Sequence, residues 1–256
     1  GELFGCAALR FDERLDEAAA ARGHALLAVW CEEVDNYLAA IARARHKHRI
    51  TRAISDALKH PVLDRGLDEA IAELRRHVAF DDLILAYRHD DDRVGTTLNY
   101  KVIKDGVLCH DSQGRGGQAV DREVDAFMRE HALSLILGRD DTVPAHFGLT
   151  HYREEVLING VAEERLVGRL VVASRRGEFN TFDRDLLERF ADYLRQRIVD
   201  FNKEYKRLSL CFPQPTVVAL LEQEDYTERL LSPRERDVAV MFCDISGFTR
   251  VSEQVL

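Results

Sequence analysis

The sequence predicts an α+β protein, in which an antiparallel sheet is flanked by helices, with a long helix before the sheet and another after it. Residues 11–58 contain no proline and are rich in alanine, which favours one long helix. Alternating apolar and polar residues at 82–88 and 96–104 indicate two strands. The nearly continuous apolar run at 166–173 indicates a strand in the interior of the sheet.

Composition narrows the class of protein. A chain of 256 residues with 46% hydrophobic content can bury one good core plus extended helices, or two small domains. The longest apolar runs fall short of the roughly 20 residues that a membrane-spanning helix needs, and a secretion-signal pattern is missing. A net charge of -9 gives no basic surface for nucleic acid. We therefore expect a cytoplasmic protein with no membrane and no nucleic acid as partner.

Two smaller features are interpreted as structural. The cysteines are an odd number without a CxxC pair, so we expect reduced thiols rather than a disulfide framework or a zinc site; they are Cys6, Cys31, Cys109, Cys211 and Cys243. The basic cluster at 43–49 falls inside a helical pattern, and we interpret it as a solvated helix face.

Apolar residues in the first helix follow a heptad spacing, the pattern that lets two helices pair along one stripe. They are Leu27, Cys31, Val34, Leu38 and Ile41. The partner of this stripe is either the same helix of a second chain or the next domain of its own chain, and the spacing leaves both open.

The last long helix carries a second apolar stripe. Thr181 is placed to cap this helix, with Asp183 and Asp185 in its first turn, where the helix dipole favours negative charge. The stripe consists of Leu187, Phe190, Leu194, Ile198, Phe201, Tyr205 and Leu208. Both stripes together predict a parallel homodimer held by coiled-coil helices.

Between these helices, further elements are expected. A helix is predicted over 69–77, a turn at Asp105-Gly106, a helix over 121–131 and a short strand over 134–137. The segments 154–158 and 166–173 are predicted as strands on either side of Asn159-Gly160.

The region 50–198 resembles a GAF domain, chiefly through LVGRLVVASRRGEFNTFDRDLLERFADYLRQRI at 166–198. The resemblance implies an antiparallel sheet of about six strands flanked by helices, with a ligand cavity or its closed relic on one side. Members of that family that bind cyclic nucleotides carry Asn-Lys and a later Phe-x-x-x-Asp-Glu. The nearest equivalents are Asn99-Tyr100-Lys101 and Phe179 with Asp183-Arg184, where the pair is split and the glutamate replaced, so the ligand of the sensor stays unknown.

Other candidate residues favour structural interpretations. His146 and His151 flank a loop and could ligate haem or a metal, but loop histidines are more often solvated. Cys109, beside His110, could be a reactive thiol, and we favour a buried one. The glycine-rich loop at 114–117 lacks the strand-to-helix setting and the lysine of a P-loop, so we expect a turn.

Residues 236–254 read RDVAVMFCDISGFTRVSEQ, an apolar strand pattern followed by an aspartate and a turn. With the preceding linker, this segment resembles the entry to the catalytic domain of class III nucleotidyl cyclases. The resemblance implies that Asp244 and the carbonyl of Ile245 are metal ligands. It also implies that the turn formed by Ser246, Gly247, Phe248 and Thr249 binds phosphate.

The chain stops at Leu256, so we expect the second metal carboxylate and the base-selecting residues to lie beyond it. The fragment alone is expected to be inactive and to hold no cofactor, whereas the parent cyclase would use Mg or Mn and bind ATP or GTP. We expect the parent cyclase, a phosphorus-oxygen lyase, to make cyclic AMP from ATP. A stand-alone GAF module that binds a small molecule, and a purely structural dimerisation unit, are the alternatives.

These resemblances divide the chain into four segments. Residues 1–58 are expected to form a helical dimerisation segment, 59–198 the GAF-like sensor and 199–233 a coiled-coil linker to the cyclase. Residues 234–256 would begin the catalytic domain. Because its sheet neighbours are missing, the apolar run 238–243 is expected to pair with its own copy in a second chain rather than with the GAF-like sheet.

Overall fold

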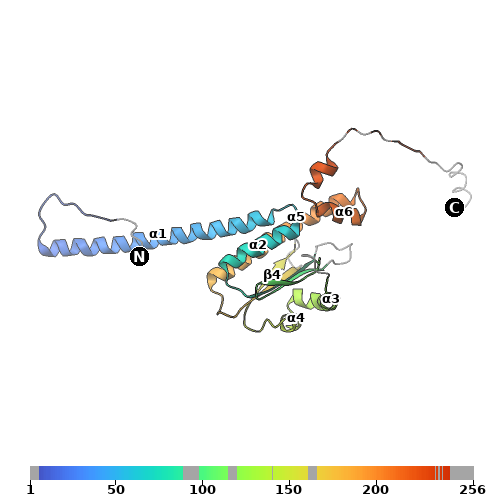
Figure 1. Cartoon of the computed structure of the whole chain (residues 1–256). Helices are drawn as coiled ribbons and strands as arrows, with labels where there is room; N and C mark the ends of the chain where they lie inside the picture. Colours follow the sequence, from blue (N-terminus) through green and yellow to red (C-terminus); the bar gives the residue numbers. More distant parts are fainter. Residues whose placement is uncertain are drawn as a thin grey trace, which may run out of the picture.

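A computed structural model gives the fold, and the structure describes residues 6–88, 98–114, 120–139, 141–160, 166–233, 235, 237 and 239–242. Within these residues the chain forms one five-stranded antiparallel sheet with helices on both faces and a long N-terminal helix (Figure 1). The mixed helix-and-strand class predicted from the sequence is therefore confirmed. The GAF resemblance implied about six strands, and the described residues form five.

The sheet has the strand order β3-β2-β1-β5-β4, so consecutive strands β1, β2 and β3 form a meander. β1 lies at the centre, where Leu85 is opposite Lys101 on one side and Leu170 on the other. The strands are β1 (Asp82–Arg88), β2 (Leu98–Lys104), β3 (Val107–Asp111), β4 (Tyr152–Asn159) and β5 (Leu166–Ser174). β1 and β5 are buried along almost their whole length, as apolar interior strands should be.

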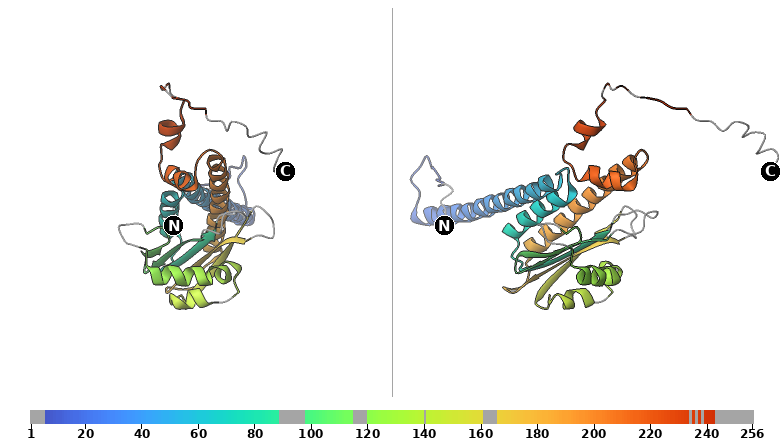
Figure 2. Two further views of the ribbon diagram at one scale, coloured as in Figure 1. Left: turned by 90° about the vertical axis from the view of Figure 1, so that its right-hand side faces the viewer. Right: turned by 45° about the vertical axis from the view of Figure 1, so that its right-hand side comes forward.

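Helices α1 (Glu17–Leu58), α2 (Leu63–His77) and α5 (Thr181–Ser209) cover one face of the sheet. Helices α3 (Arg122–Leu137) and α4 (Thr142–His146) cover the other face (Figure 2, left). The two faces have separate apolar cores, because successive residues of β1 point to opposite sides: Leu83 and Leu85 pack under α2 and α5, and Ile84 and Ala86 pack over α3.

The long helix α1 belongs to the core only at its C-terminal end. Ile50, Ile54 and Leu58 are buried there, while the part before residue 43 projects away from the sheet (Figure 1). The helix begins at Glu17 after the N-cap Asp16, whose side chain accepts the Ala19 N–H. The long helix is thus confirmed, with a start that lies six residues later than the proline-free run allowed.

The basic cluster at 43–49 is not simply a solvated face. His46 stacks on Phe182 with ring centroids 6.4 Å apart, and Lys47 pairs with Asp185 at 2.5 Å. Both partners lie in the first turns of α5. The cluster therefore attaches α1 to the start of α5, where a basic side chain complements the acidic first turn of the helix.

The predicted strand at 134–137 is wrong. Ser134, Leu135, Ile136 and Leu137 form the last turn of α3, which ends at Gly138 in the left-handed conformation, with φ 63°. Leu135 and Ile136 are both buried against the sheet. A short apolar run cannot distinguish a buried helix turn from a strand, and here the packing of α3 decides.

The N-cap of α5 is Asn180 and not Thr181. The Asn180 side chain accepts the N–H groups of Phe182 and Asp183 at 2.8 and 3.0 Å, and the Asp183 carboxylate accepts the Asn180 N–H at 3.0 Å. This reciprocal capping box satisfies donors that the first helical turn would otherwise leave without partners. Thr181 is the first helical residue.

Most of the apolar stripe of α5 is buried within its own chain. Its first four members, Leu187, Phe190, Leu194 and Ile198, are at most 1% exposed and belong to the core above the sheet. These side chains already pack on the sheet and on α1 and α2, so the predicted pairing of this stripe with a second chain is left to its later members and stays a prediction. Charged substitutions at the first four positions would damage the domain itself.

After α5 the chain turns back at α6 (Gln214–Leu221) and the short π-helical turn η1 (Thr227–Leu231). They close a small apolar cluster of Leu208, Val217, Leu220, Leu221 and Tyr226. Among the described residues of the run 238–243, positions 239–242 form no strand, and the side chains of Met241 and Phe242 are 84% and 93% exposed. Val238 and Cys243 lie outside the described residues, so pairing of this run with a second chain stays a prediction.

Removing the Asn180 side chain should lower the free energy of unfolding by about 1 kcal/mol, because a capping side chain contributes that much. Thr181→Ala is the matched control, since its hydroxyl is not the cap, and should change stability by less than half as much. Urea denaturation of both variants measures the difference. A larger loss for Thr181→Ala than for Asn180→Ala would contradict the capping assignment.

Candidate functional site

Strand β2 connects the two faces of the sheet through adjacent residues. Asn99 and Lys101 lie on the side of α2, and Tyr100 lies on the side of α3, because successive side chains of a strand point to opposite faces. All three are buried. The split Asn-Tyr-Lys sequence is thus divided between two layers, and the lysine points away from the α3 and α4 face.

On the α2 side, Lys101 lies in a nest of carboxylates. Its Nζ is 3.1 Å from Asp64 and 2.7 Å from Asp68, both on α2, and 2.6 Å from Asp111 on β3. The side chains of Lys101, Asp64 and Asp111 are nearly inaccessible, while Asp68 reaches solvent. One ammonium therefore joins β2, β3 and α2 below the surface.

Electrostatics keep this lysine charged. Burial by itself would lower the pKa of Lys101, but the negative charge of Asp64 and the hydrogen bonds to Asp111 and Asp68 outweigh burial and raise it. A charged lysine that already has three carboxylate partners is poorly suited to binding a ligand phosphate. We infer that Lys101 is a structural residue.

On the other side, Tyr100 connects β2 to α3. Its hydroxyl donates to Asp125 at 3.2 Å, and Asp125 also accepts from Nε of Arg129 at 2.7 Å. Burial, followed by the negative charge of Asp125, raises the pKa of Tyr100 well above its usual value. The backbone N–H of Tyr100 donates to the Ser112 hydroxyl at 3.1 Å, which ties the same residue to the end of β3.

An aromatic and imidazole cluster lies beside this polar chain, between α3 and α4. Phe127 stacks on His146 with centroids 3.9 Å apart and lies 4.7 Å from His131. Phe147 is 4.9 Å from His146 and 5.8 Å from His110 of β3. These rings, half-buried apart from that of His146 and facing one another between α3, α4 and β3, are the candidate functional site on this face of the sheet. His146 is exposed, as expected, although it is the last residue of α4 and stacks on Phe127.

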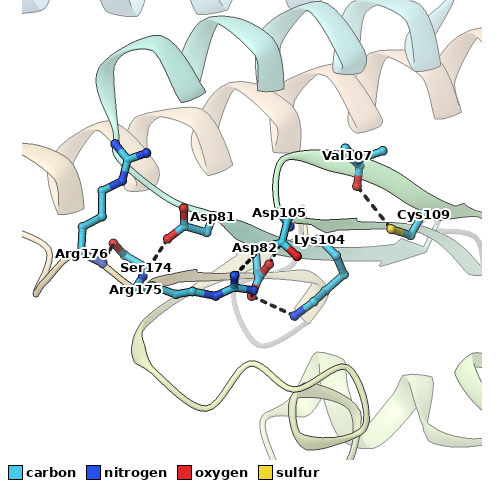
Figure 3. Close-up of polar contacts among 9 residues, drawn as sticks. All are labelled: Asp81, Asp82, Lys104, Asp105, Val107, Cys109, Ser174, Arg175 and Arg176. Carbon is cyan, nitrogen blue, oxygen red and sulfur yellow. Dashed lines mark hydrogen bonds and ion pairs between the residues drawn. The ribbon is translucent and has the colours of Figure 1, made fainter.

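A third polar group gathers at one end of the sheet (Figure 3). Asp82, at the start of β1, accepts from Lys104 at 2.8 Å and from the Asp105 N–H at 2.9 Å, and lies 3.5 Å from Arg175. Burial would raise the pKa of Asp82, but the bond from Lys104, the Asp105 N–H and the charge of Arg175 together lower it. These contacts close the ends of β1, β2 and β5.

The same end contains the predicted turn. Asp105 and Gly106 both have positive φ, 49° and 74°, as the two central residues of a tight hairpin turn require. Asp81 accepts the Gly106 N–H through its carbonyl at 2.8 Å and the Arg175 N–H through its carboxylate at 2.7 Å. Lys104 and Arg175 both pair with carboxylates inside the group, Arg175 with Asp105 as well as Asp82, so the group clamps the strand ends together.

Cys109 lies on β3 and is half-buried, with its Sγ 3.5 Å from the Val107 carbonyl (Figure 3). The expected fully buried thiol is therefore only partly correct. His151 is exposed. Gly114 has φ 62° and follows β3 in a turn, while the rest of the glycine-rich loop lies outside the described residues.

The residues matched to the cyclic-nucleotide pattern have structural roles. Phe179 is buried in the core under α5, Asp183 belongs to the capping box, and Arg184 pairs with Glu154 of β4 at 2.9 Å. Together with the orientation of Lys101, these roles give cyclic nucleotide binding no support.

The predicted catalytic-entry residues Asp244, Ile245, Ser246, Gly247, Phe248 and Thr249 all lie outside the described residues. In the part of the chain that the structure describes, no group of three or more histidine, cysteine or acidic side chains could hold a metal. The described helices also include none that is long and apolar enough to cross a membrane.

The ion cluster of Lys101 with its three carboxylates was not predicted from the sequence, although the sequence contains a pattern that indicates it. Lys101 shares a strand face with Ile103, so a lysine stands where the alternation calls for a buried residue. Asp64 and Asp68 are spaced four residues apart, which places them on one face of α2. A buried lysine in a strand together with such a pair predicts a buried ion cluster.

Searches against protein-family models and against curated proteins find no match for this chain. The functional assignment therefore depends on the residues and their geometry.

Lys101→Met should lower the free energy of unfolding by about 3–5 kcal/mol, because it leaves buried carboxylates without their cation. Lys203→Met is the control: Lys203 is exposed and pairs with Asp200 at 3.6 Å, so its loss should cost less than about 1 kcal/mol. Denaturant titrations at pH 7 measure both.

The pH dependence of the same pair of variants gives a second readout. Because the pKa of Lys101 is raised in the folded state, its contribution is complete below the ordinary value of 10.5 and is lost as pH rises through the folded-state pKa. The stability gap between wild type and Lys101→Met should therefore narrow in alkali. A gap that stays constant above this value would contradict the role of the charge.

Proposed function

We propose that this chain is the regulatory sensor and dimerisation region of a class III nucleotidyl cyclase, with a GAF-like domain as the sensor. The observation that carries the proposal is the segment VAVMFCDISGFT at 238–249, which follows a helical linker and matches the entry to that catalytic domain. The parent would convert ATP, or less favourably GTP, to a cyclic nucleotide.

The arrangement of the helices supports this role. α1 enters the sensor and α5 leaves it on the same face of the sheet, and α5 leads through α6 toward the catalytic-entry segment (Figure 1). A change in the packing of this helical layer can therefore reach the linker without crossing the sheet. The sensing face lies on the opposite side, under α3 and α4.

The residues at the catalytic entry suit a hard divalent cation. The Asp244 carboxylate and the Ile245 carbonyl offer oxygen ligands, which Mg and Mn prefer. The backbone of Ser246, Gly247, Phe248 and Thr249 would contribute N–H donors for phosphate. In the complete cyclase, the metal would neutralise the triphosphate and activate the attacking hydroxyl.

A direct assay tests the cyclase assignment. A protein that joins this chain to a complete class III catalytic domain should convert ATP to cyclic AMP, and Asp244→Ala should reduce the rate at least about a hundredfold, because it removes a metal ligand. Asp237→Ala, which changes a carboxylate just before the apolar run, is the matched control. The 256-residue chain alone should be inactive. Activity that survives Asp244→Ala would contradict the proposal.

Dimerisation is assigned to α1, because its apolar stripe is free where that of α5 is not. Trp30, Val34 and Tyr37 are 64%, 51% and 68% exposed, and Leu38 lies on the same side of the helix. Apolar residues at this helical spacing are typical of a coiled-coil seam. The second copy of this chain is the proposed partner, with the two α1 helices parallel.

Sedimentation should give a dimer mass at tens of micromolar. Val34→Glu should weaken the dimer at least about tenfold, because it places like charges inside the apolar seam. Asn36→Glu, on the polar side of the same helix, is the control and should leave the mass unchanged. A monomer for the wild-type chain would contradict the proposed dimer, and equal effects of both variants would contradict this seam.

A further inference from the structure

The chain after α5 does not simply extend away from the sensor. Residues 214–231, here called the strap, fold back on the end of α5 through the apolar cluster of Val217, Leu220, Leu221 and Tyr226 with Leu208. The Tyr226 hydroxyl also donates to Glu204 of α5. Five buried side chains form a small cluster, so the strap has little apolar area to hold it by itself.

A polar contact fastens the strap to a distant part of the chain. Glu224 pairs with Arg65, which lies 159 positions earlier at the start of α2. The same carboxylate lies 3.6 Å from Nε2 of His60, in the turn between α1 and α2. This turn, residues 59–62, is thus contacted directly by the segment that leads toward the catalytic entry.

The α1–α2 turn is held from a second side by α5. Arg197 donates from Nη2 to the carbonyls of His60 and Pro61, at 3.1 and 2.7 Å. The incoming helix α1, the outgoing helix α5 and the strap therefore meet at one turn. A change in any of them must be accommodated at His60 and Pro61.

The joint between α1 and α2 transmits movement because it is tightly packed. A Cβ on Gly66 would lie 2.7 Å from the Ala57 carbonyl oxygen and 3.0 Å from Cβ of His60. The two helices touch through backbone at this point, so α1 cannot move toward α2 without displacing the turn.

We propose that the strap is a regulatory latch: Glu224 holds it on the α1–α2 turn, and movement of α1 relative to α2 releases it. The Arg65 and Glu224 side chains are 59% and 50% exposed, and exposed ion pairs contribute little free energy. Such a contact suits a latch, since it selects one position of the strap and still opens readily.

Hydrogen exchange of the α6 amides tests the latch in the full chain. Glu224→Arg and Arg65→Glu should each speed exchange at 217–221 by about twofold to tenfold, because the attraction becomes a repulsion. The double charge-swapped variant should restore most of the protection. Glu222→Arg, which makes the same charge change where the described residues show no ion pair, is the matched control.

Gly66→Ala tests the coupling to α1. Its new methyl group pushes α1 and α2 apart without touching the strap, so α6 exchange should rise while exchange in β1 stays unchanged. Glu69→Ala, on the exposed side of α2, is its control. Exchange at α6 that stays at the wild-type rate in Gly66→Ala, or no rescue by the charge swap, would overturn the latch.

All the latch contacts lie within the described residues, and exchange is measured without any catalytic readout. Cyclase activity that survives Asp244→Ala would therefore contradict the cyclase proposal alone. Hydrogen exchange of α6 that stays unchanged in the latch variants would contradict the latch alone.

Discussion

The buried ammonium of Lys101 is the constraint on which the sheet and its helical layer depend. A charge removed from water must keep its partners, and those partners come from α2 and β3. This requirement fixes how far α2 can slide along the sheet and holds β3 at the edge. The start of α2 is in turn the place where Arg65 meets the strap, so one buried charge positions the contacts through which the latch operates.

Strand β2 also makes a polar contact on the opposite face of the sheet. Tyr100 is adjacent to Lys101 and its hydroxyl donates to Asp125 of α3, so the residue that contacts α3 and the residue that holds α2 are neighbours in one strand. A ligand that shifts α3 would pull on β2, and β2 carries the lysine that orients α2. Pairwise contacts of this kind form a continuous physical connection, and double-mutant cycles between Asp125 and Asp64 would measure its energy.

Structural features were predictable from the sequence where neighbouring residues alone determine them. The strands predicted at 82–88 and 96–104 and the long helices follow from local sequence patterns, although β1 and β2 are buried on both faces. Asn180 and Thr181 are both good caps, and only the backbone position distinguishes them. The run 134–137 fits a strand or a helix turn, and packing decides. The Lys101 nest joins residues up to 47 positions apart in sequence, which no local pattern brings together.

The projecting part of α1 has a mechanical consequence. Residues 17–42 lie ahead of the part of the helix that contacts α5 and the core, and they span roughly 39 Å at the rise of an α-helix. The helix is a lever with its short end in the core and its long end free. By simple geometry, a tilt of about ten degrees at the core displaces the far end by roughly 7 Å. Conversely, a partner that constrains the far end by a few ångströms sets the angle at His60 and Pro61 to within a few degrees.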